Sequence, residues 1–162
     1  MRERWVDVMD FPTYAVSNLG RVANNRSGRI MALARNLDGV IHVGMMRDGI
    51  QRKRSLARLV ANHFLPQPVH PCNTPMHLDG DRDNNSAENL VWRPEWFSAK
   101  YHEQFTKGDP LVDQQIRDVN TGRVYESSWH AANEHGLLDM DVYRSVQRGR
   151  TCFPTYQVFE LV

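Results

Sequence analysis

The chain has 162 residues, of which 41% are hydrophobic and 24% are charged. This composition is typical of one or two small globular domains and excludes a disordered chain. No apolar run approaches the roughly 18 residues of a transmembrane helix, and the N-terminus lacks the apolar core of a signal peptide. We therefore expect a cytoplasmic protein with no membrane partner, in which Cys72 and Cys152 are reduced thiols.

The basic residues are concentrated in the first part of the chain. Residues 1–64 carry 11 basic and 5 acidic side chains, whereas residues 65–162 carry 9 and 14. All basic residues except Lys53, Lys100 and Lys107 are arginines, whose planar guanidinium groups suit phosphate oxygens and guanine edges. This pattern indicates nucleic-acid binding, and a merely solvated basic surface is the alternative.

Residues 5–54 are predicted to form one small antiparallel sheet. Residues 5–8 read as a strand, residues 14–22 as two strands joined by a turn at Asn18–Gly20, and Asp48-Gly49 as the turn of a hairpin. Ser55 then begins a helix, because the apolar residues after it recur at helical spacing up to Phe64.

The rest of the chain predicts three more helices. Pro94 favours a helix over residues 95–106, and residues 108–110 read as a linker. A hairpin is predicted around residues 120–123, followed by a helix capped by Ser127 or Ser128 and a second helix capped by Asp139. The two short helices suggest a helix-turn-helix, in which Arg144, Gln147 and Arg148 could reach DNA. The alternative is a helical hairpin with solvated arginines.

The most informative stretch is the polar loop of residues 76–92. Asp79, Asp81 and Asp83 resemble a calcium loop, but Asn84 stands where that loop needs glycine, and Glu88 comes too early for its bidentate ligand.

The loop instead resembles the motif of the phage and intron-encoded HNH homing endonucleases. The matching residues are His77, Asp79-Gly80, Asn84-Asn85 and Asn89-Leu90-Val91-Trp92. Residues 14–22 with Trp5 resemble the N-terminal module of these proteins. Arg58–Ala61 with Phe64 resembles the helix before the motif, and residues 119–159 resemble their C-terminal region.

The resemblance implies an α+β fold, in which a small antiparallel sheet module precedes a ββα-metal (HNH) unit and a C-terminal helix-turn-helix with flanking strands follows. It implies a DNA-contacting sheet and helix module over residues 1–65, a nuclease unit over residues 66–107 and a DNA-binding region over residues 108–162. It also implies a monomer on double-stranded DNA, in the host cytosol if a phage encodes it. We expect DNA contacts from Arg21, Arg52, Lys53, Arg54, Arg144, Gln147 and Arg148.

The activity implied is metal-dependent hydrolysis of DNA phosphodiester bonds. His77 would be the general base, because an ordinary imidazole titrates near neutral pH, and Asn89 would close the loop and brace the site. Mg²⁺ or another divalent cation would stabilise the charge on the phosphate and on the leaving oxygen.

The ligand positions of the family are altered in this chain. Met76 occupies the position before the histidine, where the family has an oxygen or nitrogen ligand, and its thioether suits Mg²⁺ poorly. Ser98 occupies the second ligand position, and His102 lies one helical turn further on. Two readings follow: an active endonuclease with an altered ligand set, or an impaired HNH scaffold that binds DNA or a protein of the phage or host.

Overall fold

The computed structural model describes residues 2–162, which divide into two compact units. The first unit contains the chain up to His77 together with Asp81–Glu95, and the second contains Leu78–Gly80 and Trp96–Val162. The three-part division suggested by the HNH resemblance stays a prediction.

The strands between Trp5 and Ser55 form two small antiparallel sheets where the sequence predicted one. Strands β1 (Trp5–Val8), β2 (Phe11–Ser17) and β3 (Val22–Asn24) form one sheet, and β4 (Leu33–Arg35), β5 (Ile41–Arg47) and β6 (Ile50–Ser55) form the other. The single-sheet prediction is wrong because alternation identifies strands but not their partners: β3 and β4 are separate edge strands. The predicted hairpin is confirmed, with positive φ angles at both Asp48 and Gly49, as a type I′ turn requires.

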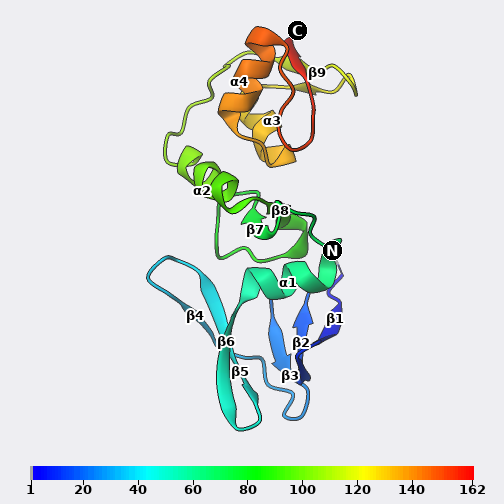
Figure 1. Cartoon of the computed structure of the whole chain (residues 1–162), viewed down its shortest axis with the longest axis vertical. Helices are drawn as coiled ribbons and strands as arrows, with labels where there is room; N and C mark the ends of the chain where they lie inside the picture. The colour runs from blue at the N-terminus through cyan, green and yellow to red at the C-terminus, as the bar shows by residue number, and fades with distance from the viewer. Residues whose placement is uncertain (1) are drawn as a thin grey trace. The chain divides into compact units, whose positions relative to one another are not determined.

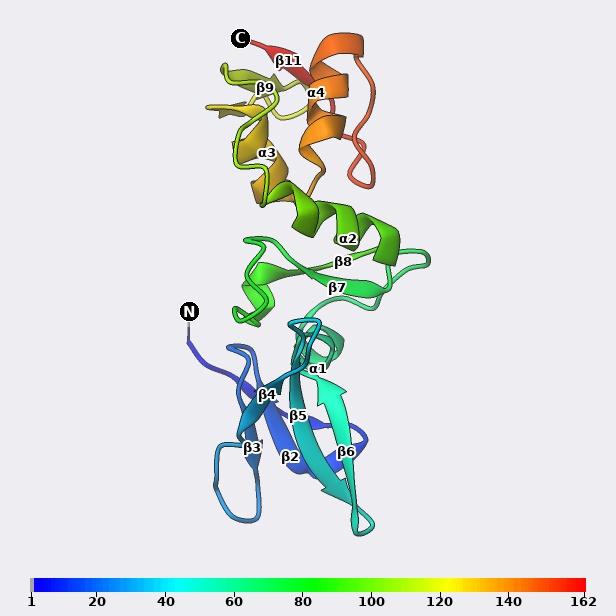
Figure 2. The same cartoon turned by 90° about the vertical axis from the view of Figure 1, so that its left-hand side faces the viewer.

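Helix α1 (Leu56–Phe64) packs its apolar face on both sheets, as Figures 1 and 2 show. The hydroxyl of Ser55 caps this helix by accepting a hydrogen bond from the backbone N–H of Arg58. Leu56, Leu59 and Val60 are buried among the inward-facing residues of β2 and β5, which makes one core from helix and sheets.

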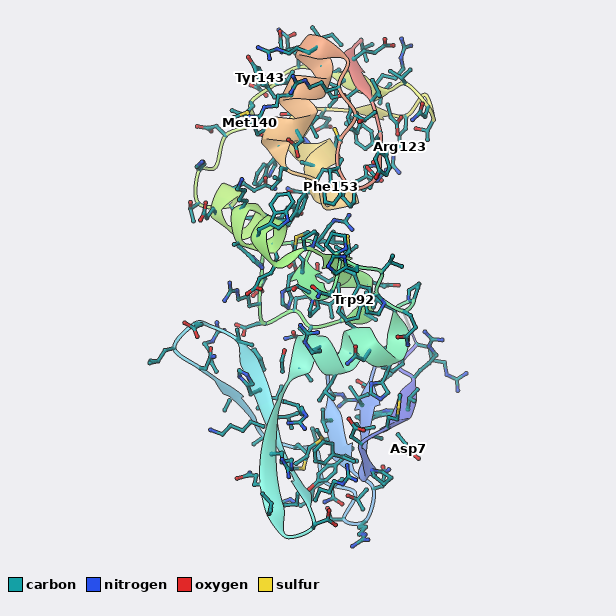
Figure 3. The ribbon with its side chains drawn as sticks, viewed as in Figure 1. Asp7, Trp92, Arg123, Met140, Tyr143 and Phe153 are labelled. Atoms are coloured by element: carbon teal, nitrogen blue, oxygen red, sulfur yellow. The ribbon has the colours of Figure 1, made fainter. Side chains whose placement is uncertain are left out.

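The other side of α1 contacts a two-stranded antiparallel hairpin, β7 (Thr74–His77) and β8 (Leu90–Arg93). A polar loop and a short 3₁₀ turn, η1 (Ala87–Asn89), connect the two strands. The indole N–H of Trp92, labelled in Figure 3, donates to the carbonyl of Pro66 over 2.9 Å, which ties β8 to the extended segment that precedes β7. Helix α2 (Glu95–Gln104) follows and ends two residues before the predicted end.

The second unit has its own core, around the strands β9 (Ile116–Asp118), β10 (Val124–Tyr125) and β11 (Phe159–Leu161). Strand β9 lies between the other two, and β9 and β10 form the predicted hairpin. Helices α3 (Ser128–His135) and α4 (Asp139–Arg148) pack against each other and on this sheet (Figure 1).

The helix boundaries of this unit correct one prediction. Ser127 caps α3, and Gly136 ends it in the left-handed conformation, as predicted. Asp139 does not cap α4 but is its first residue, after Leu138. Its carboxylate accepts a hydrogen bond from the backbone N–H of Leu111 over 2.9 Å, so this tertiary contact engages the side chain that was expected to cap the helix. Throughout the described part of the chain, no helix is long and apolar enough to cross a membrane.

Cys152, in the core of the second unit, is expected to be inert to thiol reagents. Cys152 is fully buried, and burial raises the pKa of its thiol to about 12, despite a hydrogen bond with Ser145 that acts in the other direction. At pH 8 its thiolate fraction is then about 10⁻⁴, so an aromatic disulfide reagent should label only Cys72 in the native protein and both cysteines in denaturant. Fast labelling of a folded Cys72→Ser variant would contradict the burial of Cys152.

Candidate functional site

His77 is the last residue of β7 and pairs with Leu90 at the start of β8, as the motif predicts. Its side chain is 7% exposed. Met76 lies one residue earlier, so it points to the opposite face of the hairpin, where it is fully buried. The thioether is therefore a core side chain, because the strand period directs it away from the face of the imidazole.

The imidazole of His77 is held by Asn85, in the loop between the two strands. The Nε2 atom of His77 lies 3.0 Å from Oδ1 of Asn85. The amide nitrogen of Asn85 donates to the carbonyls of Arg82 and Asp83, over 2.9 and 3.2 Å, which fixes the orientation of the amide. Because an amide oxygen can only accept, this bond requires a proton on Nε2 of His77.

This bond selects one form of the histidine. It favours the Nε2–H form, because the other tautomer would direct a lone pair of Nε2 at the amide oxygen of Asn85. The sequence pointed to an asparagine pair in this loop but not to which member faces the imidazole. Asn85 is therefore a candidate site residue that sequence reasoning missed, although the Asn84-Asn85 pair was the signal for it.

Asn89 also acts within the loop. It is nearly buried in η1, and its amide nitrogen donates to the carbonyl of Asn84 over 2.8 Å. This bond spans five residues and closes the loop, as predicted, while a direct part of Asn89 in catalysis stays a prediction. The two asparagines therefore have different roles: Asn89 closes the loop, and Asn85 binds the imidazole.

The beginning of the same loop, Leu78–Gly80, packs on α2. The hydroxyl of Tyr101 donates to the carbonyl of Leu78 over 2.6 Å. Gly80 has a φ of +74°, and a Cβ atom there would lie 2.7 Å from the ring of Phe105. Glycine is therefore required at this position both by the backbone conformation and by the aromatic ring.

The predicted metal ligands Ser98 and His102 both lie on α2. Ser98 is 7% exposed, and His102 follows it by one helical turn, so the two lie on the same side of the helix. Among residues 2–162 there is no group of three or more His, Cys, Asp or Glu side chains arranged to hold a metal ion. Mg²⁺ usually keeps several waters and binds through one or two carboxylates together with substrate phosphates. A hydroxyl and an imidazole do not supply these carboxylates, so Ser98 and His102 stay predicted ligands.

The predicted DNA-binding residues of the first unit do not form one surface. On β6, Arg52 pairs with Met45 and Arg54 pairs with Val43, so both arginines lie on the face of the sheet that carries the core. The guanidinium of Arg54 lies 5.2 Å from the ring centre of Phe11. Lys53 pairs with Gly44 on the opposite face. All three side chains are exposed, but only Arg52 and Arg54 can contact one ligand from the same face.

The remaining predicted contacts differ in their partners. Arg21 is bound by Glu3, and its Nε donates to the carboxylate over 2.9 Å; this bond lowers the pKa of Glu3 and raises that of Arg21. In the second unit, Arg144, Gln147 and Arg148 line one surface hollow on α4 together with Tyr143, which Figure 3 labels at the outer edge of this unit. The structure thus brings the three α4 residues together.

Several known proteins are similar to this chain in sequence. The family described as the NUMOD4 motif matches residues 3–45. The DNA endonuclease I-HmuI of Bacillus phage SP01 is 33% identical over 89 residues, which are 54% of this chain and 51% of that protein. Two proteins of Acanthamoeba polyphaga mimivirus, both described as uncharacterized HNH endonucleases, are 25% identical over 138 residues and 28% identical over 122 residues. The resemblance to HNH homing endonucleases is confirmed.

The fold comparison extends over nearly the whole chain. A solved structure of the HNH homing endonuclease I-HmuI superimposes with a TM-score of 0.56 and 24% identity, and covers 98% of each chain. This match confirms the α+β fold class. The alignments with the two mimivirus HNH endonucleases cover 85% and 69% of this chain but only 41% and 30% of those proteins. The chain therefore spans about half or less of the curated HNH relatives that it matches.

Proposed function

We propose that this chain is an HNH-type endonuclease that hydrolyses phosphodiester bonds of double-stranded DNA, with His77 as the general base and a divalent cation as cofactor. The observation that carries the proposal is the buried hydrogen bond between His77 and Asn85. A histidine with one nitrogen protonated and held by an amide presents its other nitrogen as a base in a defined direction. The relatives that are named endonucleases support the same activity.

In this mechanism the residues of the chain position and activate a water molecule. Nδ1 of His77 accepts the proton of the attacking water, while Nε2–H stays bonded to Asn85 and keeps the ring from rotating. Asn89 holds the loop closed, so Asn85 keeps its place during the reaction. Ser98 and His102 are the side chains of α2 that we propose as ligands, and a bound divalent cation would supply positive charge for the phosphate and the leaving oxygen.

Binding of duplex DNA is proposed for both units. Arg52 and Arg54 would contact phosphates from one face of β6, and Arg144, Gln147 and Arg148 would contact DNA from α4. The chain would act as a monomer, because the different binding surfaces of one chain suit an asymmetric site. Residues 1–65, 66–107 and 108–162 keep their proposed roles as module, nuclease unit and C-terminal DNA-binding region.

A second function is favoured by one specific observation. Met76 is a core residue, so the position before the histidine offers no hard donor to a cation. A chain with this change could keep its DNA surfaces and lack hydrolysis. This alternative is a DNA-binding scaffold, which could also bind a protein of the phage or host.

The experiment that separates the two functions uses supercoiled plasmid and linear target DNA, with Mg²⁺, Mn²⁺ or Ni²⁺. We expect nicked or linear product with at least one of these cations and none in EDTA. Binding is measured on the same preparation by fluorescence anisotropy at low salt. Binding without product under all three cations would favour the scaffold, and the absence of both would contradict the two proposals.

A further inference from the structure

A tight turn of the N-terminal module packs on the loop that holds His77. This turn, Asn18–Gly20, connects β2 and β3. The carbonyl of Asn18 accepts a hydrogen bond from the backbone N–H of Ala87 over 2.8 Å. Gly20 faces Asn85 so closely that a Cβ atom on it would lie 3.0 Å from the carbonyl oxygen of Asn85 and 3.1 Å from its Cβ. The turn therefore packs directly on the residue that binds the imidazole.

The turn itself is held firmly. Asn18 is fully buried, and its Oδ1 accepts a hydrogen bond from the backbone N–H of Arg4 over 2.6 Å. The hydroxyl of Ser17 accepts from the backbone N–H of Arg21 over 3.1 Å, which closes the turn. These bonds leave little freedom to the surface on which Asn85 rests.

A second attachment holds the part of the loop just before Asn85. Arg35, at the end of β4, forms an ion pair with Asp83, and Arg82 donates to the carbonyl of Asp38 in the connection between β4 and β5. Asp83 and Arg82 are also the residues whose carbonyls accept from the amide of Asn85. The N-terminal module thus contacts the immediate surroundings of Asn85 from two sides.

We infer that the Asn18–Gly20 turn is a positioning element for His77 and acts through Asn85. The inference rests on the proposed role of His77 as a base. If the turn moves, the backbone of Asn85 moves with it, and the amide that selects the tautomer of His77 is displaced. The module that carries the proposed DNA contacts of β6 therefore also sets the geometry of the proposed general base.

The structure offers a matched pair of glycines for the test. Gly20 and Gly28 have φ angles of +78° and +69°, so alanine is strained at both. A Cβ atom on Gly28 would meet nothing within 4 Å, whereas one on Gly20 would meet Asn85. Gly20→Ala and Gly28→Ala therefore share the backbone strain and differ in the contact with the loop.

The primary readout is the ¹⁵N spectrum of the histidine side chains in the free protein, in which the signal of His77 is assigned by its loss in His77→Ala. We expect Gly20→Ala to shift the ring nitrogens of His77 away from the Nε2–H tautomer, and Gly28→Ala to leave them unchanged. Nicking should fall by about 10²-fold in Gly20→Ala, as for a misplaced catalytic group, and change less than about twofold in Gly28→Ala.

A second variant tests the same contact if Gly20→Ala does not fold. Ala87→Pro removes the N–H that binds the carbonyl of Asn18, and Ser86 already has the extended backbone, with ψ of 145°, that a residue before proline adopts. It should shift the His77 signal in the same direction. In an Asn85→Ala background, Gly20→Ala should cause no further shift of His77, because the connecting amide is gone.

The outcomes separate this inference from the proposed function. An unchanged His77 signal in folded Gly20→Ala, or in Ala87→Pro where Gly20→Ala fails to fold, overturns the inference even if the protein cleaves DNA. A shifted signal supports the inference even if wild-type protein cleaves no DNA, in which case only the proposed hydrolysis fails.

Discussion

His77→Ala is expected to lower the rate of plasmid nicking by about 10²–10⁴-fold, the usual contribution of a general base. The loss should appear at saturating DNA, because the imidazole is 7% exposed and held by Asn85 and so contributes little surface to DNA binding. Rates are measured as the disappearance of supercoiled plasmid under single-turnover conditions.

The matched control for this variant is His130→Ala. His130 lies on α3, where its ring contacts the hydroxyl of Ser127, and it is not part of the His77 site. Its removal should leave nicking within about twofold, in the range of a surface substitution. Nicking that persists in His77→Ala at the wild-type rate would show that the reaction has another base, or that a contaminating nuclease produces it.

The double variant Arg52→Gln/Arg54→Gln is expected to weaken DNA binding by about 30-fold at 0.15 M salt. The slope of log K against log salt is negative, and each lost phosphate contact makes it shallower by about 0.9. The loss of two contacts therefore makes it shallower by about 1.8. The two arginines are expected to act together because they share one face of β6. The measurement is a series of anisotropy titrations between about 0.05 and 0.2 M salt.

Lys53→Gln tests which face of β6 binds DNA. Lys53 lies on the opposite face from its two neighbours, so its loss should change neither the slope nor the affinity if the arginine face contacts phosphates. Thermal unfolding is measured in parallel, because Arg54 also packs on the ring of Phe11, a contact worth about 0.5–1 kcal/mol at an exposed site. A larger effect from Lys53→Gln than from the double variant would reverse the proposed orientation of the sheet on DNA.

Local signals in the sequence were sufficient for most elements of this fold. Two helices begin after Ser55 and Ser127, and one ends at Gly136, as predicted. Such caps depend on hydrogen bonds and backbone angles within a few residues, so the local sequence is enough to predict them. Asp48-Gly49 made its hairpin for the same reason. Asp139 was the exception, because Leu111, which is distant in the sequence, supplies the partner of its carboxylate.

Alternation along β6 could have separated Arg52 and Arg54 from Lys53, since successive residues of a strand face opposite ways. Which face carries the core could not be read from the same strand, because nearly every residue of β6 is exposed. The partner strand β5 identifies the core face of β6, because Val43 and Met45, which pair with Arg54 and Arg52, are fully buried. The division into two sheets has the same origin, because strand pairing depends on contacts between distant segments.

The sequence by itself determined that the chain resembles the HNH homing endonucleases, and it placed His77 at the end of a strand before an asparagine-rich loop. Only the tertiary structure decided that Asn85 holds the imidazole and that the turn at Gly20 supports Asn85. The physical reason is that a motif specifies residue types along one segment. The direction of an amide in a loop is set instead by the carbonyls and the packed turn around it, and that turn lies more than 60 residues earlier in this chain.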